Sequence, residues 1–503
     1  MDQKKSILNV SVSIAFKVIT MIMVIIVKRF LIQFCGNEVN GLNALYLSIV
    51  GFLSVAELGV GSAITFCMYR PIVQGDNERV SALYGLFSRL YKIIGGVILL
   101  VGFVITPFIH YFAADYVLLD INLQITFVLM LVSVVVTYGY GAKTALINAY
   151  KNNYITTAIT SGGIILQYIL QIIVLLLTKS FAWYLACRSI AAVAQWFVTD
   201  IVARKKYQHI ISNRQKIDSE AGQEVKKNIK AMFIHKIGTL LVNTADNIII
   251  SAFVGVVALG AYSNYSTILV SMVGVLQLVF SSLTSVLGHL YVEKDKQTTQ
   301  RYHDIFYLLN FVIGVVFFLG YYAIIDDLIA VLFSADLIAA KSVSFVVTLN
   351  GFVQFMRTST LVFKDATGTF YYDRWKPVAE GIANIVLSII FVKWIGVVGV
   401  IAATIVTNLF ICHIVEPYVL YKKAFEMKPG KFYLKNYSII MLFAAALVLL
   451  HCCLVQFESH WAMLFVNGCI SVGISAAVCV LVFAWNRALV RNMKQMMKKA
   501  VSR

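Results

Sequence analysis

Charged residues are scarce in this sequence. Asp, Glu, Lys and Arg make up 13% of its 503 residues, whereas hydrophobic residues make up 60%. Soluble globular proteins carry about 25% charged residues, so the composition excludes that class. The chain has only five prolines, which favours long uninterrupted helices. Its mean hydropathy of +0.83 excludes a transmembrane β-barrel, whose strands alternate polar and apolar residues. We therefore predict an all-α polytopic membrane protein.

Motifs for metals and nucleotides are also missing. The eight cysteines form no Cys-x-x-Cys pair and no zinc-ligand spacing, and most lie in apolar runs, where they are expected to pack as small apolar side chains. The pairs Gly59-x-Gly61 and Gly139-x-Gly141 lack the strand-to-helix context of a nucleotide loop. No ATPase motif is present. We expect no bound metal and no organic cofactor.

Long apolar runs fill most of the chain. A bilayer core of about 30 Å is crossed by a helix of about 20 apolar residues. Fourteen runs of that kind are predicted, at residues 7–33, 40–69, 80–109, 117–141, 154–178, 181–203, 229–254, 260–290, 303–325, 338–363, 377–393, 396–420, 437–455 and 461–485. The first run follows the N-terminus without a small-residue cleavage site, so we expect it to stay as a membrane anchor.

Basic residues are distributed unevenly between the connecting segments. With the N-terminus inside, the cytoplasmic segments hold 31 Lys and Arg residues, and the outer segments hold only Lys179 and Lys393. Arginine and lysine keep short loops on the cytoplasmic side, so both termini are predicted to be cytoplasmic. The net charge of +18 therefore reflects membrane topology and not a nucleic-acid partner.

The sequence also resembles itself. A shift of 219 residues aligns the first two and a half spans with spans seven to nine, and the matched pairs include Gly41/Gly260, Tyr46/Tyr265 and Asp76/Asp295. Six spans per copy give parallel repeats with a site expected between them. We predict two six-helix lobes around a central cavity, at residues 1–210 and 229–425, joined by a basic linker at 211–228 and followed by two further helices and a basic tail at 426–503.

Polar residues interrupt several spans. Lys17 and Lys28 lie eleven residues apart and share a helix face, and span ten carries a polar stripe that ends at Arg357. Charges at bilayer depth are costly unless they face protein or water, so these stripes predict a wet, cationic cavity. For Arg89 and Lys92, one turn apart, a position at the membrane interface is as good an interpretation as a position in the cavity. The predicted substrate-binding residues are Lys17, Lys28, Arg29, Arg89, Lys236, Asn243, Gln354 and Arg357.

Two carboxylates lie within apolar surroundings, Glu57 in span two and Asp246 in span seven. Buried acids exchange protons near neutral pH or bind Na⁺ together with hydroxyl groups, so either residue is a candidate for coupling to H⁺ or Na⁺. A carboxylate that is simply neutralised by a neighbouring lysine, such as Lys28 or Lys236, is an equally good interpretation. The sequence leaves both interpretations open.

Two segments resemble a known family. Residues 37–87 (NEVNGLNALYLSIVGFLSVAELGVGSAI and onward) resemble spans two and three of bacterial polysaccharide flippases, and residues 244–265 (TADNIIISAFVGVVALGAYSNY) resemble their span seven. These flippases belong to the multidrug/oligosaccharidyl-lipid/polysaccharide (MOP) exporter superfamily. The resemblance implies alternating-access translocation of an undecaprenyl-pyrophosphate-linked oligosaccharide to the outer leaflet of the bacterial plasma membrane, for O-antigen, capsule or exopolysaccharide. It also implies membrane lipids, a polysaccharide polymerase and chain-length proteins as partners.

Several alternatives to a polysaccharide flippase remain. A multidrug cation exporter of the same fold would need an acidic pocket, whereas the first span supplies three cations. A lipid II flippase is a closer relative. A polysaccharide polymerase enzyme would need acid and base residues on a sizeable outer loop, and the predicted outer loops are short turns, so we expect no enzymatic activity.

Overall fold

The computed structural model describes residues 2–57, 60–213, 222–223, 225, 229 and 244–485. Within these ranges the regular elements are helices and no strand occurs, which confirms the predicted all-α class. The chain divides into two compact units. The first comprises Met1–Ser263 with Pro377–Ile385, and the second comprises Asn264–Lys376 with Val386–Arg503. The predicted domain limits stay predictions, because most of the linker 211–228 lies outside the described residues.

The helices of the first unit are mostly long and apolar. They are α1 (Asp2–Cys35), α2 (Asn37–Leu53), α3 (Val60–Gln74), α4 (Asn77–Ile105), α5 (Leu123–Tyr138), α6 (Gly141–Ala149), α7 (Asn153–Thr178) and α8 (Phe181–Ile211). The next described helix, α10 (Val256–Ser282), begins in the first unit and continues into the second.

The second unit contains the remaining helices. They are α11 (Thr284–Glu293), α12 (Lys296–Leu332), α13 (Lys341–Met356), α14 (Thr358–Thr367), most of α15 (Lys376–Thr407), α16 (His413–Val419), α17 (Gly430–Cys453) and α18 (His460–Trp485). Two π-helical turns, Asn408–Cys412 and Leu420–Phe425, flank α16.

The observed helices correspond to most of the predicted membrane spans. Ten stretches of the described chain are long and apolar enough to cross a membrane. Two further spans are helix pairs with a break between them, α2 with α3 and α13 with α14. The stretch 376–425 holds two predicted spans, because the backbone leaves the helical conformation at Ile395 and Gly396. Gly396 has φ +58°, which glycine adopts without steric cost. The predicted span 229–254 lies largely outside the described residues.

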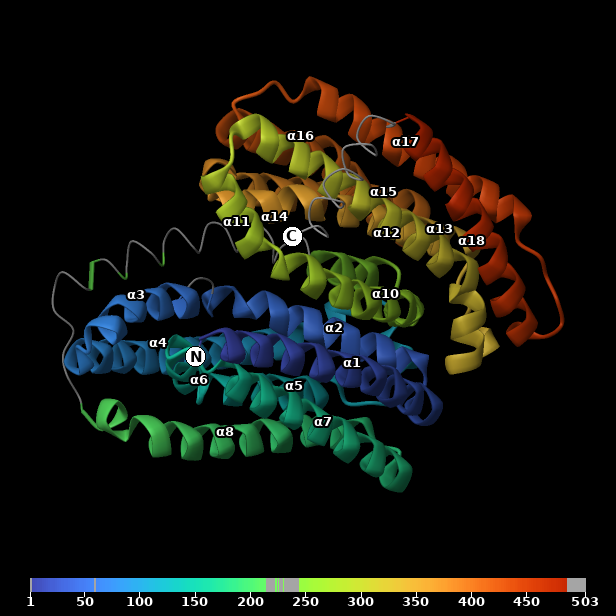
Figure 1. Ribbon diagram of the computed structural model, residues 1–503. Helices are drawn as coiled ribbons and strands as arrows, with labels where there is room; N and C mark the ends of the chain where they lie inside the picture. Colours follow the sequence, from blue (N-terminus) through green and yellow to red (C-terminus); the bar gives the residue numbers. More distant parts are fainter. Residues whose placement is uncertain are drawn as a thin grey trace. The chain divides into compact units, whose positions relative to one another are not determined.

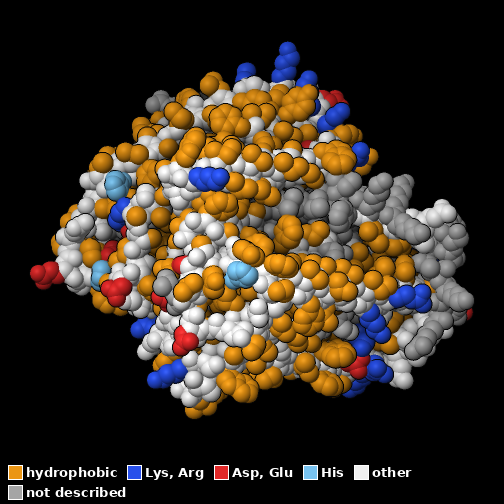
Figure 2. Space-filling view, turned by 180° about the vertical axis from the view of Figure 1, so that it is seen from behind, with side chains coloured by type: hydrophobic (Ala, Val, Ile, Leu, Met, Phe, Trp, Pro, Cys, Tyr) orange, Lys and Arg blue, Asp and Glu red, His pale blue; other side chains and the backbone are white. Residues whose placement is uncertain are grey.

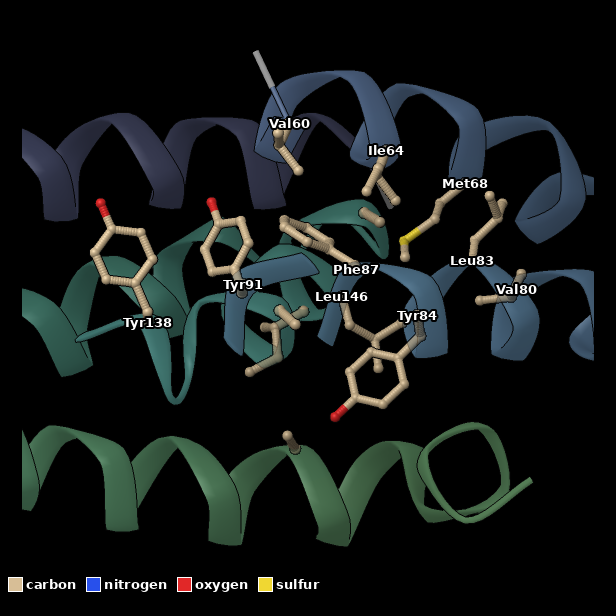
Figure 3. Close-up of a cluster of buried hydrophobic side chains, with 14 of the residues drawn as sticks. Val60, Ile64, Met68, Val80, Leu83, Tyr84, Phe87, Tyr91, Tyr138 and Leu146 are labelled. Atoms are coloured by element: carbon tan, nitrogen blue, oxygen red, sulfur yellow. The ribbon is translucent and has the colours of Figure 1, made fainter. Parts of the chain in front are cut away.

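The core of the first unit is built on α4. In Figure 1, α4, α5 and α8 run alongside one another. Figure 3 shows Ile64 and Met68 of α3 above Phe87 and Leu83 of α4, with Leu146 of α6 beneath them. Phe87, Ile64, Met68 and Leu146 are fully buried. These side chains interdigitate closely, and their packing fixes α4 between α3 and α6.

The second unit has an aromatic core. Phe352 of α13 stacks on Phe443 of α17 with ring centroids 3.6 Å apart and planes 6° apart. Phe318 of α12 meets Phe352 edge to face at 6.0 Å. Edge-to-face and stacked ring pairs stabilise beyond simple area burial, so α12, α13 and α17 are held in a fixed register.

The internal repeat is visible in the helix starts. α2 begins at Asn37 and α10 at Val256, and α4 begins at Asn77 and α12 at Lys296, so both pairs differ by the predicted 219 residues. The matched aspartates Asp76 and Asp295 are the N-caps, and each carboxylate accepts a hydrogen bond from the backbone N–H three residues later. Bonds from Thr298 hold the pKa of the Asp295 carboxyl below its usual value.

The matched glycines Gly41 and Gly260 lie where α2 crosses the first turns of α10, within the first unit. A Cβ added to Gly41 would stand 1.8 Å from the carbonyl oxygen of Val256, and one added to Gly260 would stand 2.3 Å from that of Asn37. Each glycine therefore contacts the residue that starts the other helix, and the two contacts are related by the repeat. The two backbones approach too closely for any side chain.

Candidate functional site

Glu57 lies at a break between two helices of the first unit. It ends the 3₁₀ turn Ser54–Glu57 that separates α2 from α3. Helix breaks at membrane depth leave backbone groups unpaired and occur where the chain lines a cavity or is buried in protein. Tyr91 of α4 donates a hydrogen bond from its hydroxyl to Glu57 Oε1.

A second tyrosine completes this group. Tyr138, the last residue of α5, has its ring centroid 5.5 Å from that of Tyr91, and Figure 3 shows the two rings side by side with their hydroxyls at the same edge of the cluster. A Cβ on Gly61 would stand 2.8 Å from the Tyr91 hydroxyl, and one on Gly141 would stand 2.3 Å from the Tyr91 ring. These two glycines therefore leave the space that the Tyr91 ring occupies.

The Glu57 carboxylate faces a polar cavity of about 640 Å³. Hydroxyl and amide groups line it, contributed by Thr65, Thr137, Tyr140, Thr144, Asn148 and Asn153. A single carboxylate surrounded by neutral oxygen atoms is chemically suited to bind a proton or a small hard cation such as Na⁺. We call Glu57, Tyr91, Tyr138 and this cavity the Glu57 site.

Lys28 of α1 is buried and hydrogen-bonded. Its side chain is 6% exposed, and its ammonium group donates to the carbonyl oxygen of Ser263 at 2.6 Å and to the Ser263 hydroxyl at 2.7 Å. Lys28 thereby ties α1 to α10 within the first unit. A buried ammonium group needs such partners because it is otherwise expensive to desolvate.

Arg357 lies at the break between α13 and α14 and binds a carboxylate that sequence reasoning did not pair with it. Its guanidinium donates to both oxygens of Glu416, at 2.6 and 3.1 Å, and to Asn408 Oδ1 at 2.5 Å. Lys376 donates to the same carboxylate at 2.7 Å. Glu416 is 1% exposed, so one buried carboxylate holds two cations.

The other predicted site residues are dispersed. Lys17 and Arg29 lie on α1 and are exposed. Arg89 is exposed on α4, and Gln354 donates to Asn350 at 3.2 Å within the predicted stripe. Lys236 and Asn243 lie outside the described residues. Asp246 is partly buried, and the neighbouring Asn247 donates to the Ser48 hydroxyl at 2.9 Å.

Tyr91, Tyr138 and Glu416 were missed by sequence reasoning. A tyrosine in an apolar helix gives no signal that distinguishes a packing role from a partner of an acid 34 residues away. The two Gly-x-Gly pairs did carry a signal, since each places one glycine, Gly61 or Gly141, against the Tyr91 side chain. Their role is to make room for a ring and not to bind a phosphate.

Several solved structures superpose on this chain. The lipid II flippase MurJ in an inward closed conformation superposes with a TM-score of 0.67 at 14% identity, covering 96% of this chain and 100% of that one. An inward-facing multidrug resistance MATE family transporter of the MOP superfamily superposes with a TM-score of 0.62 at 12% identity, covering 86% and 98%. The chain has the MOP superfamily fold. The resemblance drawn from the sequence is confirmed at this level.

Other comparisons agree with the MOP fold. A variant of the Vibrio cholerae MATE transporter VcmN superposes with a TM-score of 0.54 at 14% identity, covering 84% of this chain and 99% of that one. A scan against protein-family models and a search of curated proteins give no match. The MOP fold, together with ten apolar helices, makes this chain a multi-pass membrane protein. The similar structures are transporters and flippases, not enzymes.

Proposed function

We propose that this protein is a flippase that moves an undecaprenyl-pyrophosphate-linked oligosaccharide from the inner to the outer leaflet of the bacterial plasma membrane by alternating access, for surface polysaccharide assembly. The observation that carries the proposal is the placement of two exposed cations, Lys17 and Arg29, on a membrane-spanning helix of a MOP fold. A diphosphate crosses a bilayer only with cationic partners, and arginine and lysine are the side chains suited to phosphate.

The charges distinguish this proposal from a multidrug exporter. A pocket for cationic drugs needs an excess of acidic groups, since like charges oppose entry. On α1 the exposed charges Lys17 and Arg29 are both positive, and no acidic residue lies between Met1 and Glu38 except Asp2. The proposed partners are the lipid-linked oligosaccharide and membrane lipids, with a polysaccharide polymerase and chain-length proteins downstream.

The α1 cations are tested by Lys17→Ala combined with Arg29→Ala. We expect surface polysaccharide to fall about tenfold, because each hydrogen bond to a charged group contributes about 1.5–3 kcal/mol and part of that is recovered by neighbouring groups. Lipid-linked repeat units should accumulate in the inner leaflet. The measurement is polysaccharide per cell at equal protein abundance, with leaflet assignment of the lipid-linked glycans.

Lys393→Ala is the matched control for that experiment. Lys393 is also an exposed cation, but it lies in a predicted outer turn, so its removal should leave polysaccharide unchanged. Normal polysaccharide in the Lys17/Arg29 double variant would contradict the proposal. Sensitivity of a deletion strain to cationic dyes, with no trapped lipid-linked glycan, would favour the multidrug alternative.

We further propose that the Glu57 site couples transport to H⁺ or Na⁺. Glu57→Gln keeps an oxygen that accepts the Tyr91 hydrogen bond but cannot ionise. We expect this variant in proteoliposomes to transport at the same rate with and without an ion gradient, whereas the wild type should be accelerated by one. Tyr91→Phe should show a partial loss of acceleration, because it removes only one hydrogen bond to the carboxylate.

Glu78→Gln is the control for the coupling experiment. Glu78 is an exposed acid in the first turn of α4, so its neutralisation should leave the acceleration intact. Full acceleration in Glu57→Gln would exclude Glu57 and direct the search to Asp246.

A lipid II flippase is the second candidate function, favoured by the superposition on MurJ over 96% of this chain. Both candidates need a cationic path for a diphosphate, so they differ only in the glycan. Extraction of undecaprenyl-linked glycans from a deletion strain separates them. Accumulation of the peptidoglycan precursor would replace the polysaccharide proposal.

A further inference from the structure

A second cavity of the first unit adjoins the Glu57 site, with which it shares Tyr138. It has a volume of about 1140 Å³ and opens between α4, α6 and α8 of the first unit. Four cations line it, namely Arg89 and Lys92 of α4, Lys143 of α6 and Arg204 of α8. We call it the lateral basic pocket. Tyr138 is the one lining residue that also belongs to the Glu57 site, and the proposed transport function uses none of the four cations.

The charges of the lateral basic pocket are only partly balanced. Asp200 accepts hydrogen bonds from Lys143 and, at 2.8 Å, from Arg204. Arg89 and Lys92 are exposed, and within the described part of the chain no carboxylate pairs with either of them. Three of the four positive charges thus remain uncompensated, which makes the pocket attractive to an anion.

An apolar stripe continues from these cations along α4. Residues 85, 89, 92, 96 and 100 recur at helical spacing and share one face. A Cβ on Gly85 or Gly96 would meet nothing within 4 Å, and Leu100, one turn beyond Gly96, is 65% exposed. This face of α4 therefore carries the two cations first and then an open, apolar surface at Gly96 and Leu100.

α8 carries a parallel arrangement. Arg204 lies near its C-terminal end, and the exposed side chains of Ile201, Phe197 and Trp196 follow in the opposite direction along the helix. On both helices the cations lie toward the end predicted to be cytoplasmic, and the exposed apolar residues lie toward the bilayer centre. Figure 2 shows one face of the molecule, on which hydrophobic side chains predominate and most Lys and Arg side chains lie toward the edge of the view.

The depth of the cations suits a lipid headgroup. The 29 residues of α4 span about 44 Å, which exceeds the bilayer core of about 30 Å by about nine residues. If that excess projects on the predicted cytoplasmic side, Arg89 lies about one turn inside the interface. Long basic side chains at that depth extend toward the headgroups while their stems stay in apolar surroundings.

From this arrangement we infer that the lateral basic pocket binds an anionic phospholipid of the cytoplasmic leaflet. The phosphate of the headgroup is held by Arg89 and Lys92, and the acyl chains lie along the apolar stripes of α4 and α8. Basic pockets between membrane helices on the cytoplasmic side bind anionic headgroups in this way. The bound lipid stays in its leaflet and is distinct from the transported substrate.

The test is a titration of the purified full-length protein in detergent with phosphatidylglycerol or phosphatidylcholine, followed by native mass spectrometry. We expect the wild type to bind phosphatidylglycerol about tenfold more tightly than phosphatidylcholine. Arg89→Ala combined with Lys92→Ala should weaken phosphatidylglycerol binding about thirtyfold, since each of the two cations near the surface contributes about 1 kcal/mol. Arg89→Lys combined with Lys92→Arg should retain the binding.

Two further variants separate the charge from the open surface. Lys422→Ala combined with Lys423→Ala removes two exposed cations from the second unit and should leave binding unchanged. Gly96→Phe places a bulky ring on the open surface next to the cations without altering charge, and it should weaken binding even if the double alanine variant fails to fold. Equal binding of both lipids, unchanged binding in both Arg89/Lys92→Ala and Gly96→Phe, or displacement by millimolar inorganic phosphate would each overturn the inference.

Discussion

Replacing Arg357 by alanine is expected to lower the free energy of unfolding by about 3–5 kcal/mol, because the change leaves a buried carboxylate with one of its two cations missing. Glu416 is 1% exposed and accepts two hydrogen bonds from the Arg357 guanidinium. Arg357 also binds Asn408 in a π-helical turn, so α13, α14 and α16 should loosen together. Thermal unfolding of the purified protein in detergent measures the effect.

Two comparison variants separate the effect of the Arg357 charge from that of its hydrogen-bond geometry. Arg357→Lys keeps the charge but cannot form the two parallel bonds, so an intermediate loss is expected. Arg357→Met combined with Glu416→Gln and Lys376→Met removes all three charges and should recover part of the stability, because a neutral group avoids the cost of a buried, under-compensated carboxylate. A triple variant as unstable as Arg357→Ala would show that shape, and not charge, stabilises this region.

Gly41→Ala is expected to destabilise the protein by about 3 kcal/mol and to abolish most transport. The added methyl group would stand 1.8 Å from the carbonyl oxygen of Val256, which is backbone and cannot rotate away. Overpacking of this kind commonly costs about 1–3 kcal/mol, and the absence of a movable neighbour places Gly41 at the upper end. The unfolding temperature and the transport rate in proteoliposomes report the two effects.

Gly162→Ala is the matched control for Gly41→Ala. Gly162 lies on an exposed face of α7, and a Cβ there would meet nothing within 4 Å. Because alanine favours helix over glycine by about 1 kcal/mol, this variant should be as stable as the wild type or slightly more stable. Gly41→Ala with wild-type stability would mean that the crossing of α2 and α10 has room to separate.

The fold could be predicted largely from the sequence because membrane helices follow simple rules. Apolar run length sets the spans, and within the described residues the structure has helices or broken helices at the predicted places. The 219-residue repeat matched Asp76 with Asp295, and the structure shows that both are N-caps and that the helices they begin start 219 residues apart, since the same local chemistry produces the same local structure. The distribution of basic residues predicts that both termini are cytoplasmic, and the structure does not test this orientation.

The candidate site could be predicted only in part. Glu57 was identified because an acid in an apolar span is costly and therefore informative. Its partner Tyr91 and the partner of Arg357, Glu416, lie 34 and 59 residues away, and such pairings depend on how helices pack. Lys28 illustrates the same limit. The sequence placed it in the membrane, but only the packing of α1 against α10 shows that Ser263 satisfies its ammonium group.

The contact between α2 and α10 relies on main-chain acceptors. Asn37 and Asn40 donate to the carbonyl oxygens of Val257 and Gly260, both at 3.2 Å, and any residue in those positions offers the same oxygen. The acceptor at Val257 therefore does not depend on which side chain that position carries. Such tolerance is consistent with a shared architecture at 14% identity to MurJ. A helix crossing held by main-chain acceptors is expected to keep its backbone geometry while much of the surrounding amino-acid sequence changes.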